Sequence, residues 1–201
     1  MQPDPLYRSV LDSPFGPLTL LVSERGARAI HFGALAGPPG TSDSERHTAA
    51  LARQLREYFR GKRREFDLPL DWQGTTFQQK VWRALLRIPY GQTASYGDVA
   101  RAIRHPRAFR AVGGANRRNP LPILVPCHRV LGSDGSLTGY SGPTRLDIKA
   151  GLLALEQKQP WCSPSHRSHA AFPSGKAARG GRAALPAGKI GAKGCAPSPQ
   201  N

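Results

Sequence analysis

The chain has 201 residues, 39% of them hydrophobic, and carries 29 Lys or Arg against 13 Asp or Glu, which gives a formal net charge of +16. Its apolar runs fall well short of the ~20 residues that a membrane-spanning helix needs, and its N-terminus has neither the basic nor the apolar region of a secretory signal, so we expect a cytoplasmic protein without membrane contact. The three cysteines, Cys127, Cys162 and Cys195, are odd in number and widely spaced, which argues against a disulfide framework and against a CxxC zinc site, so no metal is expected.

The N-terminal part of the sequence predicts a small α/β domain. The hydrophobic pattern of residues 18–23 and 27–32 predicts two strands joined by a tight turn at Gly26, because glycine supplies the positive φ that such a turn needs. Residues 46–61, "RHTAALARQLREYFRG", place apolar side chains at helical spacing and end in glycine. Residues 66–72 alternate apolar and polar side chains, as a half-buried strand would. Nothing in this domain resembles a reactive site.

The pattern then changes to helices. The segment "TTFQQKVWRALLRIPYG" predicts a core helix with a capping box at Thr76 and Gln79 and an end at Pro89. The segment "TASYGDVARAIRHP" predicts a second helix, with Ser95 as its N-cap and Asp98 three residues later. Each has apolar residues on one face, as a buried helix does.

The third predicted helix, within "RAFRAVGGANRRN", is short, basic and rich in small residues. Glycine inside a helix costs about 1 kcal/mol relative to alanine, so the Gly-Gly pair indicates that another molecule must approach closely. With the helix before it, this helix forms a helix-turn-helix whose second helix can approach a nucleic acid backbone. The candidate DNA-binding residues are Arg107, Arg110, Ala111, Gly113, Gly114 and Arg117.

The positive charge is concentrated around this third helix. Residues 1–79 carry 10 basic and 9 acidic side chains, whereas residues 80–129 carry 10 basic side chains and the single acid Asp98. Residues 158–201 add 7 basic side chains and no acid. A dense basic segment indicates a polyanionic partner, usually nucleic acid, because neutralising phosphates releases counterions. The alternative is an arginine-rich surface that is merely solvated.

One stretch, "NPLPILVPCHRVLG", carries a candidate nucleophile. Its prolines at 120 and 122 oppose a helix, and Ile123–Val125 are expected to form a short buried strand that positions Cys127. A thiol beside the imidazole of His128 is a simple way to make a nucleophile from a group with an ordinary pKa of roughly 8.5. Taken alone, a Cys-His dipeptide is better interpreted as a buried thiol next to a surface imidazole without a chemical role.

The surroundings point to a known family. The segments "GQTASYGDVARAI", "RAVGGANRRNP", "PILVPCHRV" and "LTGYSG", followed by "KAGLLALE", resemble the O6-alkylguanine-DNA alkyltransferases, also called methylated-DNA-protein-cysteine methyltransferases. The resemblance implies an α/β, ribonuclease H-like domain over residues 1–73. A mostly α, winged helix-turn-helix-type domain over 74–157 then carries the active site. Residues 158–201, rich in Gly, Pro, Ser and Ala, are expected to form a basic disordered tail.

The resemblance also implies catalytic roles. Cys127 is the expected alkyl acceptor, activated through a water by His128, which Glu156 orients. Asn119 is expected to hold the turn that carries the cysteine. Tyr96 is expected to donate to the guanine base and to help neutralise it as it leaves.

The same resemblance assigns the contacts with DNA. Arg110 is expected to fill the base stack when the damaged nucleotide is extruded, and Val130, Tyr140 and Ser141 to form the wall and the donors of the guanine pocket. The implied activity is transfer of an alkyl group from O6 of guanine, with O4-alkylthymine as a further possible substrate, to the protein's own cysteine. A thioether is not hydrolysed by any group visible in the sequence, so each molecule acts once, without a cofactor. Double-stranded DNA is the expected partner of a monomeric protein, which in a bacterium would associate with the nucleoid.

Two other functions remain open at this point. An alkyltransferase-like module would bind lesions without repairing them, but such proteins lack the acceptor cysteine, which this chain has. A cysteine hydrolase would not need the basic helix, and adjacent residues seldom point at each other. The sequence also departs from the family pattern at Arg117, Thr144 and Arg145, where glycine is common, without removing a catalytic group.

Overall fold

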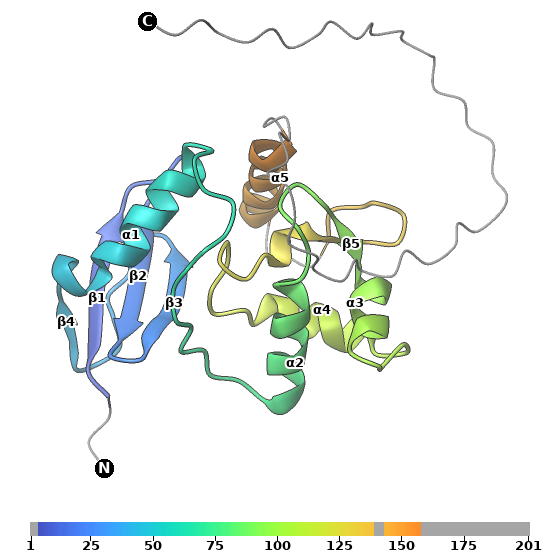
Figure 1. Ribbon diagram of the computed structural model, residues 1–201, viewed down its shortest axis with the longest axis horizontal. Coiled ribbons are helices and arrows are strands. Elements are labelled where there is room, and N and C mark those ends of the chain that lie inside the picture. Colours follow the sequence, from blue (N-terminus) through green and yellow to red (C-terminus); the bar gives the residue numbers. More distant parts are fainter. Residues whose placement is uncertain (1–3, 139–142, 158–201) are drawn as a thin grey trace, which may run out of the picture.

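The computed structural model describes residues 4–138 and 143–157, which form a sheet region and a helical region side by side (Figure 1). The predicted tail, residues 158–201, lies outside the described residues. Within the described ranges no helix has the length and apolarity to cross a membrane.

The N-terminal region is a four-stranded sheet covered by one helix, α1. The strand order is β3-β2-β1-β4, with β1, β2 and β3 antiparallel and β4 parallel to β1. The predicted hairpin is confirmed as β2 and β3, while β1 and β4 were not predicted. Their bounds are Leu6–Leu11 for β1, Leu18–Ser23 for β2, Gly26–Phe32 for β3, Thr41–Asp43 for β4 and Glu45–Phe59 for α1.

The strand predicted over residues 66–72 is wrong. This segment makes a single isolated bridge, between Leu70 and Ala27 of β3, supported by hydrogen bonds from Ala27 N to Pro69 O (2.9 Å) and from Asp71 N to Ala27 O (2.8 Å). Proline has no N–H to donate to a ladder, so Pro69 limits the pairing. The alternating apolar side chains still pack against the core, which explains the pattern in the sequence.

Three short helices build the second region. They are α2 (Thr76–Leu85), α3 (Tyr96–Ala102) and α4 (Phe109–Arg117), and α4 packs against both of the others. The capping box of α2 is Thr75 and Gln78, one residue earlier than predicted, and that helix ends at Leu85 rather than at Pro89. The predicted capping box of α3, Ser95 and Asp98, is confirmed.

Two further elements connect these helices to the segment around Cys127. Strands β5 (Ala94–Ser95) and β6 (Val130–Leu131) pair in parallel. Since β5 leads directly into Tyr96 and β6 directly follows the short 3₁₀ helix η1 (Cys127–Arg129), this pairing brings Tyr96 to the cysteine segment. Helix α5 (Pro143–Gln157) closes the described chain.

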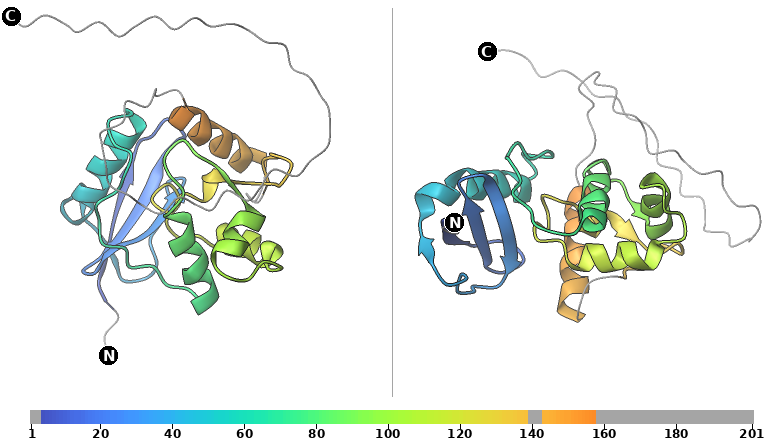
Figure 2. Two further views of the ribbon diagram at one scale, coloured as in Figure 1. Left: turned by 45° about the vertical axis from the view of Figure 1, so that its right-hand side comes forward. Right: turned by 90° about the horizontal axis from the view of Figure 1, so that it is seen from below.

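The sheet and helical regions share one buried core. Buried apolar residues from β2, α1, α2, α4 and α5 belong to a single cluster, and Ile30 N in β3 donates to Pro120 O (2.8 Å). Figure 2 shows the sheet with α1 on one side of the molecule and α2, α3 and α4 on the other. The fold class expected from the sequence is therefore confirmed, with contacts between the two regions.

Candidate active site

A tight turn, rather than the predicted strand, carries Cys127. Val125 N donates to Leu121 O (2.8 Å), and Ile123 has a φ of 77°, which is rare for a β-branched residue. Asn119 joins the two sides of this turn, because its Nδ2 donates to Val125 O (2.8 Å) and its Oδ1 accepts from Leu121 N (3.0 Å). The prediction of a strand over Ile123–Val125 is wrong because two of its backbone groups bond locally.

The cysteine and histidine of the motif are both buried. Cys127 is 4% exposed and His128 is fully buried, at the start of η1. His128 Nε2 lies 2.9 Å from Oε1 of Glu156 in α5, and both side chains have no exposed surface. The expected histidine and carboxylate are thus in hydrogen-bond contact, 28 residues apart in the chain.

Glu156 is the centre of a buried hydrogen-bond network. Arg129 donates from Nε to Oε2 and from Nη2 to Oε1, each at 2.9 Å. Tyr58 of α1 donates its hydroxyl to Oε1 at 2.8 Å, and the backbone N of Gly91 donates to Oε2 at 3.0 Å. With His128, four residues therefore hold the carboxylate, and one of them, Tyr58, belongs to the N-terminal region.

The network sets the charge of Glu156 and of His128. Burial by itself would raise the pKa of Glu156, but hydrogen bonds from His128 and Arg129 outweigh burial and hold that pKa well below its usual value. Burial lowers the pKa of His128, against the opposing effect of Glu156. At neutral pH the pair is therefore a carboxylate and a neutral imidazole.

The hydrogen bond to Glu156 also selects the tautomer of His128. A carboxylate only accepts, so the neutral imidazole carries its hydrogen on Nε2 and its lone pair on Nδ1. Nδ1 is buried and has no hydrogen-bond partner among the residues that the structure describes. His128 therefore offers an unprotonated nitrogen suited to accept a proton.

Tyr96 and Lys149 meet at one carbonyl beside the cysteine. Thr138 O accepts from the Tyr96 hydroxyl (2.9 Å) and from Lys149 Nζ (2.7 Å), and Lys149 also donates to Val130 O (2.5 Å). Burial lowers the pKa of Lys149 to about 8, while the neighbouring Cys127 acts to raise it. By the same interaction, a protonated Lys149 favours the thiolate of Cys127.

Apart from Phe109, which is 49% exposed, the exposed residues on and just before α4 are basic or small. Arg107, Arg110, Ala111 and Arg117 are exposed, and Gly113 and Gly114 are half-buried. The nearest heavy atoms to a Cβ added at Gly113 and at Gly114 would be 3.9 and 3.8 Å away, so alanine would fit within the folded chain at both positions. The fold does not itself demand these two glycines.

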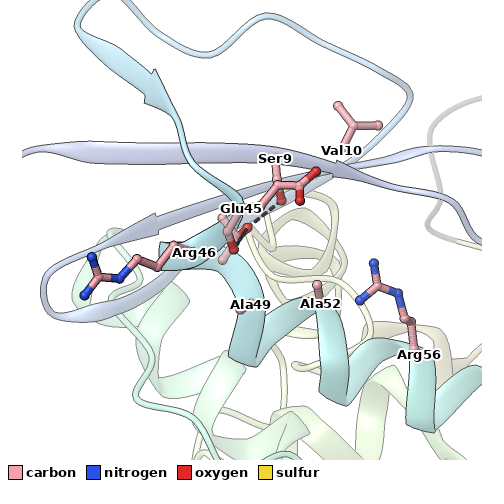
Figure 3. A pocket seen from close by; sticks show the side chains of 8 residues that line it. Ser9, Val10, Glu45, Arg46, Ala49, Ala52 and Arg56 are labelled. Carbon is pink, nitrogen blue, oxygen red and sulfur yellow. Dashed lines mark hydrogen bonds between the residues drawn. The ribbon is translucent and has the colours of Figure 1, made fainter.

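The described chain also has a hollow remote from this site, between β1 and α1 (Figure 3). Its volume is about 310 Å³, and its lining contains neither cysteine nor histidine. The lining residues are Ser9, Val10, Glu45, Arg46, Thr48, Ala49, Ala52 and Arg56. None of them belongs to the network around Cys127.

Comparison with known proteins places the chain in a family. Residues 76–158 match the model of the 6-O-methylguanine DNA methyltransferase DNA binding domain, and residues 6–72 match the model of the ribonuclease-like domain of the same protein. The chain belongs to the 6-O-methylguanine DNA methyltransferase family. The predicted resemblance is confirmed across most of the described chain.

Individual members of the family are similar over nearly their whole length. A methylated-DNA–protein-cysteine methyltransferase of Methanosarcina barkeri is 47% identical over 158 residues, covering 76% of this chain and 98% of its own. The crystal structure of Mycobacterium tuberculosis O6-methylguanine methyltransferase is 42% identical, with a TM-score of 0.72, covering 79% of this chain and 96% of its own. A crystal structure of the M. tuberculosis OGT in complex with DNA is 44% identical, with a TM-score of 0.69, and covers 76% and 92%.

The structure gathers most of the predicted methyltransferase residues into two places. Cys127, His128 and Glu156 are buried together, half-buried Asn119 holds the turn before them, and the pairing of β5 with β6 brings Tyr96 and Val130 to the same place. The predicted DNA contacts lie on and just before α4. Tyr140 and Ser141 lie outside the described residues, as do the side chains of Thr144 and Arg145.

Sequence reasoning missed the residues that complete the buried network. Arg129 and Lys149 stood inside the quoted motifs, and Lys149 precedes Glu156 by seven residues, a spacing that places both on one face of a helix. That spacing was a usable signal. Tyr58 gave none, because its contact with Glu156 spans 98 residues.

Proposed function

We propose that this protein repairs DNA by transferring the alkyl group of O6-alkylguanine irreversibly to its own Cys127. The observation that carries the proposal is the hydrogen bond between His128 and Glu156 next to a buried Cys127, in a chain 47% identical to a named methylated-DNA–protein-cysteine methyltransferase. It acts as a single-turnover S-methyltransferase. We place its catalytic domain at residues 74–157, its ribonuclease H-like domain at 1–73 and a basic tail at 158–201.

The first step makes the thiolate. Nδ1 of His128 takes the proton of Cys127 through one water, while Glu156 stabilises the imidazolium that forms. The ammonium group of Lys149 lowers the free energy of the thiolate further. Asn119 holds the turn so that the sulfur stays at the entrance of η1.

The second step transfers the alkyl group. The thiolate attacks the alkyl carbon in line, forming a C–S bond while the C–O6 bond breaks and its electron pair passes to guanine. Tyr96 donates a hydrogen bond to the base and offsets the negative charge that develops on it. Overall, the proton of the thiol ends on the restored guanine and the protein keeps a thioether.

Reaction requires the base to leave the duplex, since O6 lies inside the stack. Arg107 and Arg117 neutralise phosphates, and the small surface at Ala111, Gly113 and Gly114 lets the backbone of α4 approach the minor groove. Arg110 fills the space that the nucleotide leaves. Val130, Tyr140 and Ser141 receive the base.

The protein works as a monomer in the cytoplasm, associated with the nucleoid in a bacterium. O4-alkylthymine is its candidate second substrate.

A duplex oligonucleotide with one O6-methylguanine inside a restriction site tests this function. Cleavage by an enzyme that requires unmodified guanine should return after incubation with the wild-type protein, in proportion to the protein added. Cys127→Ala should bind the same duplex without restoring cleavage. Tight binding by the wild type without restored cleavage would instead identify a lesion-binding module of the alkyltransferase-like kind.

A further inference from the structure

A buried amide on α4 lacks the hydrogen bonds that its burial demands. Asn116 is 6% exposed, and neither its Nδ2 nor its Oδ1 has a hydrogen-bond partner within residues 4–138 and 143–157. An unsatisfied buried polar group destabilises a fold, and native proteins retain few of them. A hydrophobic residue of the same size would stabilise the fold better, so stability does not explain why an amide occupies this position.

The position of Asn116 points to Tyr96. Gly113 and Asn116 are three residues apart on α4 and therefore share a face of that helix. A Cβ added to Gly113 would lie 3.9 Å from Cε1 of Tyr96, so this face packs on the phenol ring. Burial raises the pKa of Tyr96, whereas its bond to Thr138 and the nearby amide of Asn116 act to lower it. The amide thus faces the hydroxyl end of the ring.

The hydroxyl is occupied in the unbound protein. Tyr96 donates its single hydrogen to Thr138 O at 2.9 Å, a carbonyl that Lys149 already satisfies at 2.7 Å. To donate to an extruded guanine, the hydroxyl must give up Thr138. The phenol oxygen keeps its lone pairs in either state, and a neighbouring N–H can bond to one of them.

We propose that Asn116 is a positioning residue that acts through Tyr96, donating from Nδ2 to the phenol oxygen when the hydroxyl turns from Thr138 to the extruded base. A phenol that accepts a hydrogen bond is a stronger donor, because the accepted bond offsets the negative charge left on its oxygen. Asn116 thereby aims the hydroxyl and helps guanine to leave. The inference rests on the proposed alkyl transfer and adds a residue to it.

The substitution Asn116→Leu separates this role from a structural one. If the amide only fills space, the variant should melt at or above the wild-type temperature and react normally. If Asn116 acts through Tyr96, the variant should still melt no lower than the wild type, yet transfer the alkyl group about tenfold more slowly, the equivalent of one lost hydrogen bond at roughly 1.4 kcal/mol per tenfold. Asn116→Met removes the same amide with a more flexible side chain and serves if Asn116→Leu does not fold.

The decisive experiment is a double-mutant comparison with free O6-benzylguanine, which needs neither DNA binding nor base extrusion. Benzylation is followed by intact mass for the wild type, Asn116→Leu, Tyr96→Phe and the double variant. We expect Asn116→Leu to lower the rate of benzylation when Tyr96 is present. The double variant should react at the same rate as Tyr96→Phe alone. Equal slowing in both backgrounds, or a wild-type rate in Asn116→Leu, would overturn it. A wild-type protein that gains neither a benzyl group from this base nor a methyl group from O6-methylguanine in duplex DNA would contradict the proposed function instead.

Discussion

The two regions of the molecule use their arginines differently. In the N-terminal region five of the nine arginines pair with acids; for example, Arg8 lies 2.6 Å from Asp43, and Arg28 lies 2.7 Å from Asp71. Their charges are balanced within the fold. A balanced surface gives DNA little reason to bind, whatever its number of arginines.

Around α4 the arrangement is the reverse. The single acid of residues 80–129, Asp98, already pairs with Arg101. Arg107, Arg110 and Arg117 have no acidic partner in the part of the chain that the structure describes. We infer that the arginines around α4 that have no acidic partner are the candidates to neutralise phosphate.

Substituting an acid that pairs with an arginine tests how much the pairing stabilises the fold. The largest loss of stability should come from the buried network around Glu156. Glu156→Gln leaves Arg129 buried without a carboxylate, which costs about 3–5 kcal/mol of unfolding free energy. Glu57→Gln, which removes the surface partner of Arg53 and Arg63, should change stability very little. Urea unfolding of both variants measures this, and similar losses in the two would mean that the buried network is no more important than a surface pair.

Removing the arginine predicted to replace the extruded base should affect duplex repair next most strongly. Arg110→Ala should slow repair of O6-methylguanine in duplex DNA roughly 10- to 100-fold, since base extrusion costs a few kcal/mol. Its reaction with free O6-benzylguanine should stay near the wild-type rate. Arg53→Ala in the paired region serves as the control with no effect on either substrate. Equal losses on both substrates would assign Arg110 to chemistry or folding rather than to extrusion.

The unpaired arginines should also set the salt dependence of DNA binding. Arg107→Gln and Arg117→Gln should each reduce the slope of log affinity against log salt by about one. Arg53→Gln should leave the slope unchanged. Fluorescence anisotropy with a labelled duplex across a range of salt concentrations provides the measurement, and identical slopes for all three variants would break the distinction between paired and unpaired cations.

Substituting the two glycines of α4 should raise stability and lower the affinity for DNA. Because alanine fits at Gly113 and Gly114 within the fold, Gly113→Ala and Gly114→Ala should each stabilise the protein by up to about 1 kcal/mol. Gly114→Ala should weaken DNA binding, because its added methyl group keeps the helix from the DNA backbone, whereas the methyl group of Gly113→Ala would lie against Tyr96 and should weaken binding less. Thermal melting and duplex affinity, measured on the same samples, report the two effects. Lower stability with unchanged affinity would show that the glycines serve the fold.

The smallest predicted effect is the dependence of folding stability on pH. The pKa of His128 is lowered by burial from its ordinary 6.5, so the unfolded chain binds more protons below that pH and stability falls as the pH drops through it. The pKa of Glu156 is also lowered, from 4.5, so its contribution is present above pH 4.5 and is lost progressively below it. Denaturant midpoints should therefore decline from pH 7 to pH 5 and more steeply under pH 4.5. A midpoint that rises between pH 7 and pH 5 would contradict these assignments.

Much of this site follows from local sequence patterns. Helical periodicity predicted α1 to α4, and the resemblance of the segments around Cys127 and Glu156 to the family gave the expected acceptor and its carboxylate before any contact was known. Short-range geometry limited the rest. The alternation of apolar and polar residues over 66–72 reflects packing against the core, but Pro69 limits the backbone pairing to a single bridge. The backbone of residues 123–125 forms hydrogen bonds within a turn instead of in a strand.

Contacts between distant residues could not be predicted in the same way. The hydroxyl of Tyr58 reaches Glu156 only because the fold brings the last turn of α1 to the last turn of α5, and the amide of Asn116 looks like any helical asparagine until its burial is known. Neither residue carries a pattern in its own segment. The fold brings them to the site, so three-dimensional structure was needed to find them.

The central claim, that Cys127 is the acceptor and reacts once, is tested most directly by mass spectrometry. The protein is incubated with excess duplex containing O6-methylguanine, and its intact mass is followed to completion before digestion with trypsin. Cleavage after Arg118 and Arg129 releases residues 119–129, in which Cys127 is the sole cysteine. We predict a gain of one methyl group per molecule, carried by this peptide and unchanged by further substrate. A methyl group on Cys162 or Cys195, or removal of more than one methyl group per protein molecule, would contradict the account.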